Sequence, residues 1–355
     1  MEKLRTGIIG CGKVGDFHAK VYAELPQSEF VAVCDADSAR AEAFASRYGV
    51  KAYTDVATMC RDARLDVVSI CTPHPLHASP AVAAADCGCN VLVEKPLASS
   101  LEDCDAIIAA EKRNHVTVGT MVQRRFYRPC MRIHKAIEDG KLGRPVLGMV
   151  TMLGWRDEAY YNSDPWRGTW KGEGGGVVVT QAPHQLDLLL WYMGEVDEVY
   201  GVWKNLNHPY IEVEDTAVAV VKFKSGAVGN IVVSNSQNPA LYGRVHIFGE
   251  NGAAAGVQTD GLSQVCLLLQ SLLITTCGRC PAKRNSWKNG KKGTATSSTV
   301  WTPCITITAS RSKISSRLCR VAKSRWWTPQ RADARWSCSQ PSTEARRITP
   351  SLNSR

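Results

Sequence analysis

The stretch Gly10-Cys11-Gly12-Lys13-Val14-Gly15 decides the fold of this chain. It completes a strand-like run over residues 4–10 and opens a helix-like stretch over residues 16–25. In this strand–turn–helix context, Gly10 allows a tight turn, Gly12 lets the backbone approach a pyrophosphate, and Gly15 lets the helix pack closely on the strand. The N-terminus of the helix then faces the phosphates. The spacing therefore predicts a Rossmann fold that binds a dinucleotide.

The second predicted strand, residues 30–34, ends in Asp35. A carboxylate at this place accepts hydrogen bonds from both ribose hydroxyls and repels a 2′-phosphate, which favours NAD over NADP. Helix-like stretches at 38–48, 55–61, 80–86 and 101–114 then alternate with strand-like stretches at 52–53, 66–71, 90–93 and 117–122. This alternation predicts a doubly wound parallel sheet in a dinucleotide-binding domain over residues 1–122.

Three segments follow predicted strands of that sheet: Thr72-Pro73, Glu94-Lys95-Pro96 and Gln123. Ligands of such sheets bind at the carboxyl ends of the strands, so we expect these segments to line the cofactor crevice. Lys95 is the candidate proton acceptor, because a lysine near a cationic nicotinamide has a lowered pKa, as the base in alcohol oxidation requires. The alternative is a surface lysine in a loop; the flanking Glu94 and Pro96 favour the catalytic role.

A second domain is expected over residues 123–261, where the turn Gly174-Gly175-Gly176 precedes a helix-like stretch. His184, Asp187 and Trp191 stand at positions i, i+3 and i+7 and therefore share one face of that helix. Beyond it, residues 198–206, 215–222, 228–234 and 243–249 alternate apolar and polar side chains between turn signals. The pattern predicts an α+β domain with an open, mostly antiparallel sheet that has one solvated face.

These motifs together resemble the glucose–fructose oxidoreductase, inositol dehydrogenase and rhizopine-catabolism (Gfo/Idh/MocA) family. The resemblance rests on the turn at Gly10, Asp35, the segment Cys71-Thr72-Pro73-His74 with His77, and Glu94-Lys95-Pro96. It implies an NAD(P)-dependent dehydrogenase or reductase that transfers a hydride between the nicotinamide and a secondary hydroxyl or ketone of a sugar, sugar derivative or cyclitol. In the family, the lysine that Lys95 matches is the catalytic or orienting residue.

The resemblance continues in the second domain. The family follows its three glycines with an Asp, a His and a second Asp, and His184 and Asp187 match the last two. Thr180 stands where the family usually has the first Asp. Threonine can hydrogen-bond a sugar hydroxyl but cannot serve as a base near neutral pH, so proton abstraction would rest on His184, Lys95 or both.

The expected site combines the residue patterns with this resemblance. Catalysis is assigned to Lys95 and His184. Cofactor binding is assigned to Gly10, Gly12, Lys13, Val14, Gly15, Asp35, Arg40, Thr72, Pro73, His77, Glu94, Lys95 and Gln123. Substrate binding is assigned to Arg125, Trp166, Arg167, Thr180, Gln181, His184 and Asp187, and no metal is expected. The aromatic side chains of residues 155–170 can either face a polyhydroxylated ligand or pack the loop, and both alternatives stay open.

The charge of the chain is unevenly distributed. Of the 43 Lys and Arg residues 17 follow Gly261, against two of the 33 Asp and Glu residues, which leaves 26 basic and 31 acidic side chains in the first 261 residues. Five of the ten tryptophans also follow Gly261. This composition is typical neither of a folded domain nor of a disordered linker. We therefore interpret residues 262–355 as an aberrant basic tail that truncates the second domain.

A shifted reading frame would explain this tail. If the gene is read one nucleotide earlier, each Trp codon gives an apolar residue and then a codon that begins with G, so Trp301-Thr302 forces an Asp and Trp287-Lys288 forces a Glu. The restored frame also permits amphipathic helix patterns over residues 312–320 and 338–345. The alternative is a natural basic extension that binds nucleic acid. An intact mass and resequencing after Gly261 decide between the two.

Composition disfavours several other classes. No apolar stretch approaches the roughly 20 residues of a membrane span, and no signal-like segment stands at the start, so we expect a cytoplasmic protein. The eight cysteines before residue 262 lack the spacing of a disulfide framework and are expected to be reduced. We expect a small-molecule sugar or polyol as partner, no nucleic acid or membrane, and a homo-oligomer, dimer or tetramer, if the second domain is intact. The functional alternative is a dinucleotide-binding redox sensor without turnover.

Overall fold

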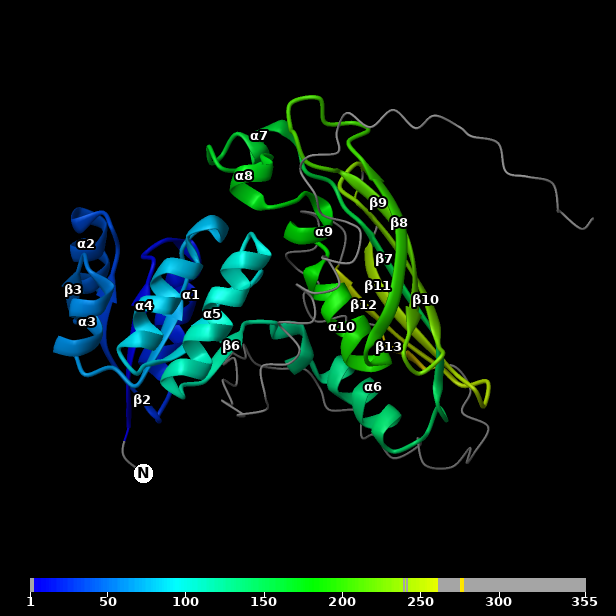
Figure 1. Ribbon diagram of the computed structural model, residues 1–355, viewed down its shortest axis with the longest axis horizontal. Helices are drawn as coiled ribbons and strands as arrows, with labels where there is room; N and C mark the ends of the chain where they lie inside the picture. The colour runs from blue at the N-terminus through cyan, green and yellow to red at the C-terminus, as the bar shows by residue number, and fades with distance from the viewer. Residues whose placement is uncertain (1–2, 239, 241, 261–274, 278–355) are drawn as a thin grey trace, which may run out of the picture.

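The computed structural model describes residues 3–238, 240, 242–260 and 275–277. Apart from residues 275–277, the interpretation of residues 262–355 as a shifted reading frame lies outside the described residues. Two β-sheets dominate the described part, one in each half of the molecule (Figure 1). The first half contains β1 (Leu4–Ile9), α1 (Lys13–Glu24), β2 (Ser28–Cys34), α2 (Ser38–Tyr48), β3 (Lys51–Tyr53), α3 (Val56–Asp62), β4 (Val67–Ile70), α4 (Ala78–Asp86), β5 (Asn90–Val93), α5 (Leu101–Asn114) and β6 (Val118–Thr120).

The first sheet is parallel throughout and has the strand order β3-β2-β1-β4-β5-β6. The chain therefore winds outward from β1 in one direction and returns to start again at β4, which is the doubly wound topology that the alternation predicted. Both faces are covered, because neighbouring strand residues contribute to different cores. Ile8 and Val33 pack with α1 and α2, whereas Ile9 and Ala32 pack with α3, α4 and α5.

The second sheet has the order β13-β12-β11-β7-β10-β9-β8 and is antiparallel except for the parallel pair β7 and β10. Its strands are β7 (Pro145–Leu153), β8 (Val196–Lys204), β9 (Thr216–Phe223), β10 (Val228–Ser234), β11 (Tyr242–Gly249), β12 (Ala254–Asp260) and β13 (Thr275–Cys277). The mostly antiparallel sheet confirms the predicted fold class. The parallel pair is possible because helices and two further strands separate β7 from β10 in the chain, which supplies the long crossover that parallel pairing needs.

Helices cover one face of the second sheet, the face toward the first domain (Figure 1). They are α6 (Arg128–Glu138), α9 (Val177–Thr180) and α10 (Pro183–Met193). The short helices α7 (Glu158–Tyr161) and α8 (Trp170–Glu173) contribute Tyr161 and Trp170 to a separate cluster with Ile211 and Val213. The core on this face joins Leu188 and Leu189 of α10 to Val150 of β7 and Val245 of β11. Two short 3₁₀ helices, η1 (His74–Leu76) and η2 (Gln123–Phe126), follow strands β4 and β6. The helices thus bring the segment after β6 and the start of α10 between the two sheets.

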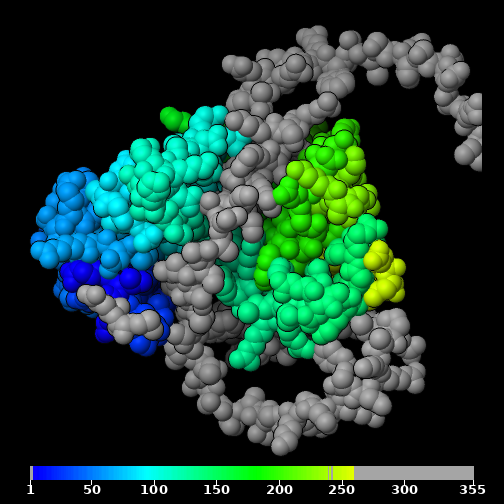
Figure 2. Space-filling model, turned by 60° about the horizontal axis from the view of Figure 1, so that its bottom comes forward, coloured from blue at the N-terminus to red at the C-terminus, as the bar shows by residue number. Residues whose placement is uncertain are grey.

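The glycine-rich turn of the second domain touches the first domain. Gly174 has a φ of +73°, and a Cβ atom there would lie 2.2 Å from the carbonyl oxygen of Ser99. Gly176 is equally confined, because its Cβ would lie 1.7 Å from the carbonyl oxygen of Glu214. In the space-filling view the two domains lie side by side (Figure 2). The turn needs glycine because only glycine lets the backbones approach this closely.

Within the described residues, no helix has the length and the apolar character that a membrane crossing would require. The eight cysteines from Cys11 to Cys130 are free thiols, and all but Cys87 are buried.

Candidate active site

The turn after β1 has the geometry that a pyrophosphate requires. Gly10 has a φ of +100°, and a Cβ there would lie 2.7 Å from the backbone at Cys71. A Cβ on Gly15 would lie 2.1 Å from the carbonyl oxygen of Gly10, whereas nothing lies within 4 Å of the corresponding position at Gly12. No side chain caps the N-terminus of α1, so its first N–H groups remain for a ligand. The residues present therefore fit a dinucleotide, with Lys13 and Val14 exposed in the first turn of α1.

Asp35 lies beside this turn, at the end of β2. Its Oδ2 accepts a hydrogen bond of 2.9 Å from the amide of Cys11, and its Oδ1 accepts one of 3.0 Å from the amide of Asp37. The guanidinium of Arg40 is 3.3 Å from Asp35 and 3.3 Å from Asp37. Asp35 thus ties the glycine turn to β2, and two carboxylates balance the charge of Arg40. The cofactor contacts assigned to Asp35 and Arg40 stay predictions.

The segments after β4 and β5 are joined by His77, whose side chain is fully buried. Its Nδ1 lies 2.8 Å from the carbonyl oxygen of Pro96, and its Nε2 lies 2.9 Å from that of Thr72. The Thr72 hydroxyl donates to the carbonyl of Leu76 at 2.8 Å. His77 therefore positions both segments through their backbones. The direct cofactor contacts assigned to Thr72, Pro73 and His77 stay predictions.

Glu94 is held by a chain of buried polar groups from α1 and β4. His18 Nε2 lies 2.9 Å from Glu94 Oε1, and its Nδ1 lies 3.0 Å from the Ser69 hydroxyl, which in turn is 2.7 Å from the hydroxyl of Tyr22. The second oxygen of Glu94 accepts a 3.1 Å hydrogen bond from the amide of Lys95. Both carboxylate oxygens thus have partners, which fixes the start of the loop that carries Lys95. Sequence reasoning missed His18 because no local motif surrounds it.

Lys95 reaches from the first domain to the second. Its Nζ donates a 3.1 Å hydrogen bond to the carbonyl oxygen of Thr180, at the end of α9. Burial lowers the pKa of Lys95; Glu94 opposes this effect, and three nearby guanidinium groups reinforce it. The Thr180 hydroxyl donates to the carbonyl of Gly176 at 2.8 Å. The backbone of Thr180, rather than its hydroxyl, is therefore the group that meets Lys95.

His184 stands in the first turn of α10, directly after Pro183. Its Nδ1 is buried and has no hydrogen-bond partner among the described residues. Burial lowers the pKa of His184 well below its usual value, and the charges of Arg124 and Lys95 lower it further. The imidazole is consequently neutral near pH 7, and one of its ring nitrogens can accept a hydrogen bond.

Asp187 and Arg125, both assigned to substrate binding, contact each other. Arg125 Nε donates to Asp187 Oδ2 at 2.7 Å, and Nη2 donates to Oδ1 at 2.5 Å. The Asp187 side chain is 2 % exposed. The Arg125 guanidinium also lies 5.4 Å from the ring centroid of Trp191. His184, Asp187 and Trp191 all lie in α10, the helix that their spacing predicted. This pair anchors η2 to α10, and any direct contact with a substrate stays a prediction.

The loop between α7 and α9 brings its aromatic and basic side chains together. Trp166 lies 5.1 Å from the ring of His74, and Arg167 Nη1 donates to the hydroxyl of Tyr160 at 2.8 Å. Gln181 Nε2 donates to the same hydroxyl at 3.0 Å. The loop thus contacts both the segment after β4 and the end of α9. Gln123 is exposed at the start of η2, and its cofactor contact stays a prediction.

Several groups near Lys95 were not assigned from the sequence. The pKa of His74 is lowered to about 3 by burial and by the charges of Lys95 and Arg167. Glu214 accepts hydrogen bonds from the amides of Gly176 at 2.7 Å and Val178 at 3.1 Å, and burial raises its pKa to about 7. The motif Cys71-Thr72-Pro73-His74 could have identified His74 as a candidate site residue. No local signal could have identified Glu214, because it meets the glycine turn only through folding.

Two family models match most of the described chain. The model of the oxidoreductase family with an NAD-binding Rossmann fold matches residues 4–122. The model of the GFO/IDH/MocA C-terminal domain matches residues 130–255. These two models match both halves of the fold described above, including Lys95 in the first half and His184 in the second.

Individual relatives agree with these models. The chain is 33 % identical over 257 residues to myo-inositol 2-dehydrogenase of Thermotoga maritima, covering 70 % of this chain and 74 % of the relative. It is 31 % identical over 262 residues to an uncharacterized oxidoreductase of Bacillus subtilis, covering 72 % and 74 %. Among solved structures, it is similar to the WlbA dehydrogenase of Bordetella pertussis, with a TM-score of 0.68, 30 % identity and coverage of 74 % and 77 %. The chain belongs to the Gfo/Idh/MocA family of NAD-binding oxidoreductases.

Proposed function

We propose that the protein transfers a hydride between NAD and a secondary hydroxyl or ketone of a sugar, sugar derivative or cyclitol. Residues 1–122 would bind the cofactor, and residues 123–261 would bind the substrate. The relative from Thermotoga maritima is a myo-inositol 2-dehydrogenase, and the WlbA structure was determined in complex with NADH and UDP-GlcNAcA. Both names support a polyhydroxylated substrate for this chain.

The observation that carries the proposal is the position of Lys95 between the two domains. Its ammonium has three donors, of which one contacts the Thr180 carbonyl, so further donors remain for a substrate oxygen. His184 lies in the same electrostatic environment, since the charge of Lys95 lowers the pKa of its imidazole. The proposed site thus combines one titratable side chain from each domain.

The chain's own residues can manage the hydroxyl proton. When bound, NAD⁺ supplies the hydride acceptor. The neutral imidazole of His184 can accept a hydrogen bond from the hydroxyl, and Lys95, whose pKa is lowered, can hold the same oxygen and exchange its proton. Thr180 contributes no base, because a hydroxyl does not ionise near neutral pH and its proton is donated to the Gly176 carbonyl.

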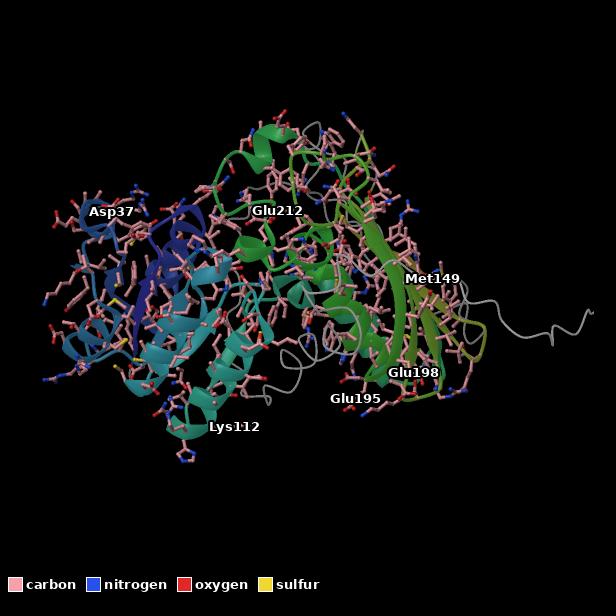
Figure 3. All side chains as sticks on the ribbon, turned by 45° about the horizontal axis from the view of Figure 1, so that its top comes forward. Asp37, Lys112, Met149, Glu195, Glu198 and Glu212 are labelled. Carbon is pink, nitrogen blue, oxygen red and sulfur yellow. The ribbon has the colours of Figure 1, made fainter. Side chains whose placement is uncertain are left out.

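Replacement of Lys95 tests this function. Lys95→Met should keep NAD binding near its original strength and reduce turnover by about a hundred- to ten-thousandfold, the usual share of a general acid or base. The control is Lys112→Met, on the exposed end of α5 (Figure 3), which should change neither quantity. The assay follows NADH formation over a panel of sugars and cyclitols. Cofactor binding without turnover on every compound would favour the redox sensor instead.

We also propose that the second sheet forms a homo-oligomer through the face that no described helix covers. Tyr200 and Val202 of β8 pair across the ladder with Val220 and Val218 of β9, and these four side chains are 74, 62, 57 and 43 % exposed. The sequence pattern predicted a solvated face here, but neighbouring apolar side chains of this size on a surface are typical of contact with another protein. At the start of β8, Glu195 pairs with Lys224 and Glu198 pairs with Lys222; both acidic residues are labelled in Figure 3.

A further inference from the structure

Two guanidinium groups converge on one tyrosine beside the proposed reaction centre. Arg156 follows β7 and Arg167 precedes α8, and their central carbons lie 5.2 Å and 4.5 Å from the ring centroid of Tyr160. Arg167 also donates to the Tyr160 hydroxyl at 2.8 Å. Arg156 Nη2 donates to Gln181 Oε1 at 2.6 Å, and Gln181 Nε2 donates to the same hydroxyl at 3.0 Å. We call Arg156, Arg167 and Tyr160 the arginine clamp.

The arginine clamp adjoins Lys95 through the backbone. Gln181, which links Arg156 to Tyr160, directly follows Thr180, whose carbonyl oxygen accepts the hydrogen bond from Lys95 Nζ. The same loop reaches the segment after β4, because Trp166 contacts the ring of His74. The arginine clamp is thus linked to Gln181, the residue next to the one whose carbonyl Lys95 contacts.

Buried groups hold Arg156 in place. Its carbonyl oxygen lies 2.8 Å from Nε2 of His208, and Nδ1 of that ring lies 2.7 Å from Asp215 Oδ2. Both His208 and Asp215 are fully buried. The amide of Arg156 donates to the carbonyl of Asn235 at 3.2 Å. Arg156 therefore projects from a rigid backbone rather than from a loose loop, as a binding residue should.

The nearby carboxylates lie on Arg167 rather than on Arg156. Asp164 pairs with Arg167 at 2.9 Å. Glu173 accepts from the amide of Gly168 at 2.8 Å, and its other oxygen lies 3.9 Å from Arg167. Within the described residues, the side chain of Arg156 has neutral acceptors only, the carbonyl of Trp155 and Gln181. Arg156 is thus the guanidinium of the arginine clamp that has no carboxylate partner among the described residues.

The remaining hydrogen-bonding capacity of the arginine clamp is that of a donor. The Tyr160 oxygen already accepts from Arg167 and Gln181, which occupies its lone pairs and leaves its O–H to donate. Guanidinium groups only donate, and their planar geometry matches carboxylate and phosphate. A half-buried cation without a counter-ion is unfavourable, so an anion would stabilise this arrangement.

We infer, on the basis of the proposed dehydrogenase function, that the substrate is an anion, a sugar or cyclitol that carries a carboxylate or phosphate, and that the arginine clamp binds this group. The pKa values of the neighbouring bases also register the cations of this region. After burial, the charges of Lys95 and Arg167 lower the pKa of His74, and those of Arg124 and Lys95 lower that of His184. A bound anion would offset these cations.

The test compares matched ligands on the NADH-loaded protein by titration calorimetry. One set is glucose, glucuronate and glucose 6-phosphate, and a second is myo-inositol with its monophosphate. We expect the carboxylate or the phosphate member of a set to bind about ten- to a hundredfold more tightly than the neutral member, since hydrogen bonds between charged groups are the strong ones. This advantage should shrink as salt is added. The glucuronate and phosphate arms identify which anion is preferred.

Two variants test whether the arginine clamp causes the preference for anionic ligands. Arg156→Gln should remove most of the advantage of the anionic ligand and leave the affinity for the neutral one within about twofold, because only one charge-assisted contact is lost. The control, Arg113→Gln, removes an equal charge from an exposed ion pair with Asp86 on the first domain and should leave the advantage intact. Circular dichroism of both variants establishes that they fold.

Each outcome decides the inference separately from the proposed function. Equal binding of anionic and neutral members in both sets, or an equal effect of the two variants, overturns the arginine clamp as an anion site. Turnover of a neutral sugar with kcat/KM at least as high as that of its acid overturns the anionic substrate and leaves the dehydrogenase intact. Anion binding that depends on Arg156, without turnover of any compound, supports the arginine clamp and overturns the proposed function.

Discussion

The ion pair between Arg125 and Asp187 offers a prediction that requires no knowledge of the substrate. Two hydrogen bonds of 2.7 Å and 2.5 Å join the side chains, which are 15 % and 2 % exposed. The pair ties η2, next to the first domain, to the middle of α10. Replacing the carboxylate by an amide, Asp187→Asn, keeps the shape and removes the charge, so the guanidinium is left buried without its counter-ion.

The expected loss in the free energy of unfolding follows from the burial of the ion pair. Removing one partner of a buried ion pair costs about 3–5 kcal/mol. The lower end applies here, because Arg125 is slightly exposed and keeps its contact with the Trp191 ring. A loss of about 3 kcal/mol corresponds to a decrease in Tm of roughly 6–12 °C for a domain of this size.

Thermal unfolding followed by tryptophan fluorescence measures this shift, since Trp191 reports on the region itself. The double variant Arg125→Met, Asp187→Leu should recover most of the lost stability, because apolar residues of similar volume replace buried ion pairs at little cost. A decrease in Tm below about 2 °C for Asp187→Asn, or a double variant as unstable as the sum of the single ones, would refute the reasoning. An increase in KM without loss of stability would instead indicate that Asp187 contacts the substrate.

Three further predictions concern the cofactor, the proton and the uncovered sheet. Asp35→Ala should weaken NAD binding by about ten- to a hundredfold, through lost charged hydrogen bonds, and NADP binding far less; equal losses in fluorescence titrations would contradict the ribose contact. In the oxidation direction, kcat/KM should rise with pH as Lys95 loses its proton, because its lowered pKa lies below the ordinary value of 10.5; a rising limb that persists in Lys95→Met would assign it to another group. Val220→Lys places a charge among exposed apolar side chains and should reduce the mass measured by light scattering to that of a smaller assembly, whereas an unchanged mass would place the oligomer contact elsewhere.

The first domain was largely predictable because its signals are local. The glycine turn works through backbone crowding between residues a few positions apart, as the contact of Gly15 with Gly10 demonstrates. Helices α2 and α5 begin at Ser38 and Leu101, directly after the capping residues Asp37 and Ser100 whose side chains accept from the first turn. Their observed bounds, Ser38–Tyr48 and Leu101–Asn114, equal the predicted ones.

The second domain was less predictable. Helix α6 and strands β7 and β12 were not predicted, although β7 lies in the middle of the sheet. Strand β7 pairs with β10 and β11, which lie far along the chain. No turn signal next to β7 indicates that it pairs with either strand. Periodicity recognised the strands that follow one another through short turns, such as β9 and β10.

The sequence by itself determined the Rossmann turn, the carboxylate at Asp35, and the candidates Lys95 and His184, because each stands at a fixed offset from a strand or a turn. Only the tertiary structure decided what these side chains meet. The pairing of Arg125 with Asp187 spans 62 positions, and that of Lys95 with the Thr180 carbonyl spans 85. The convergence of Arg156 and Arg167 on Tyr160 also depends on how the loops dock against α9. Such contacts arise when whole elements pack together, and the burial that follows sets the charges and the pKa values of the site.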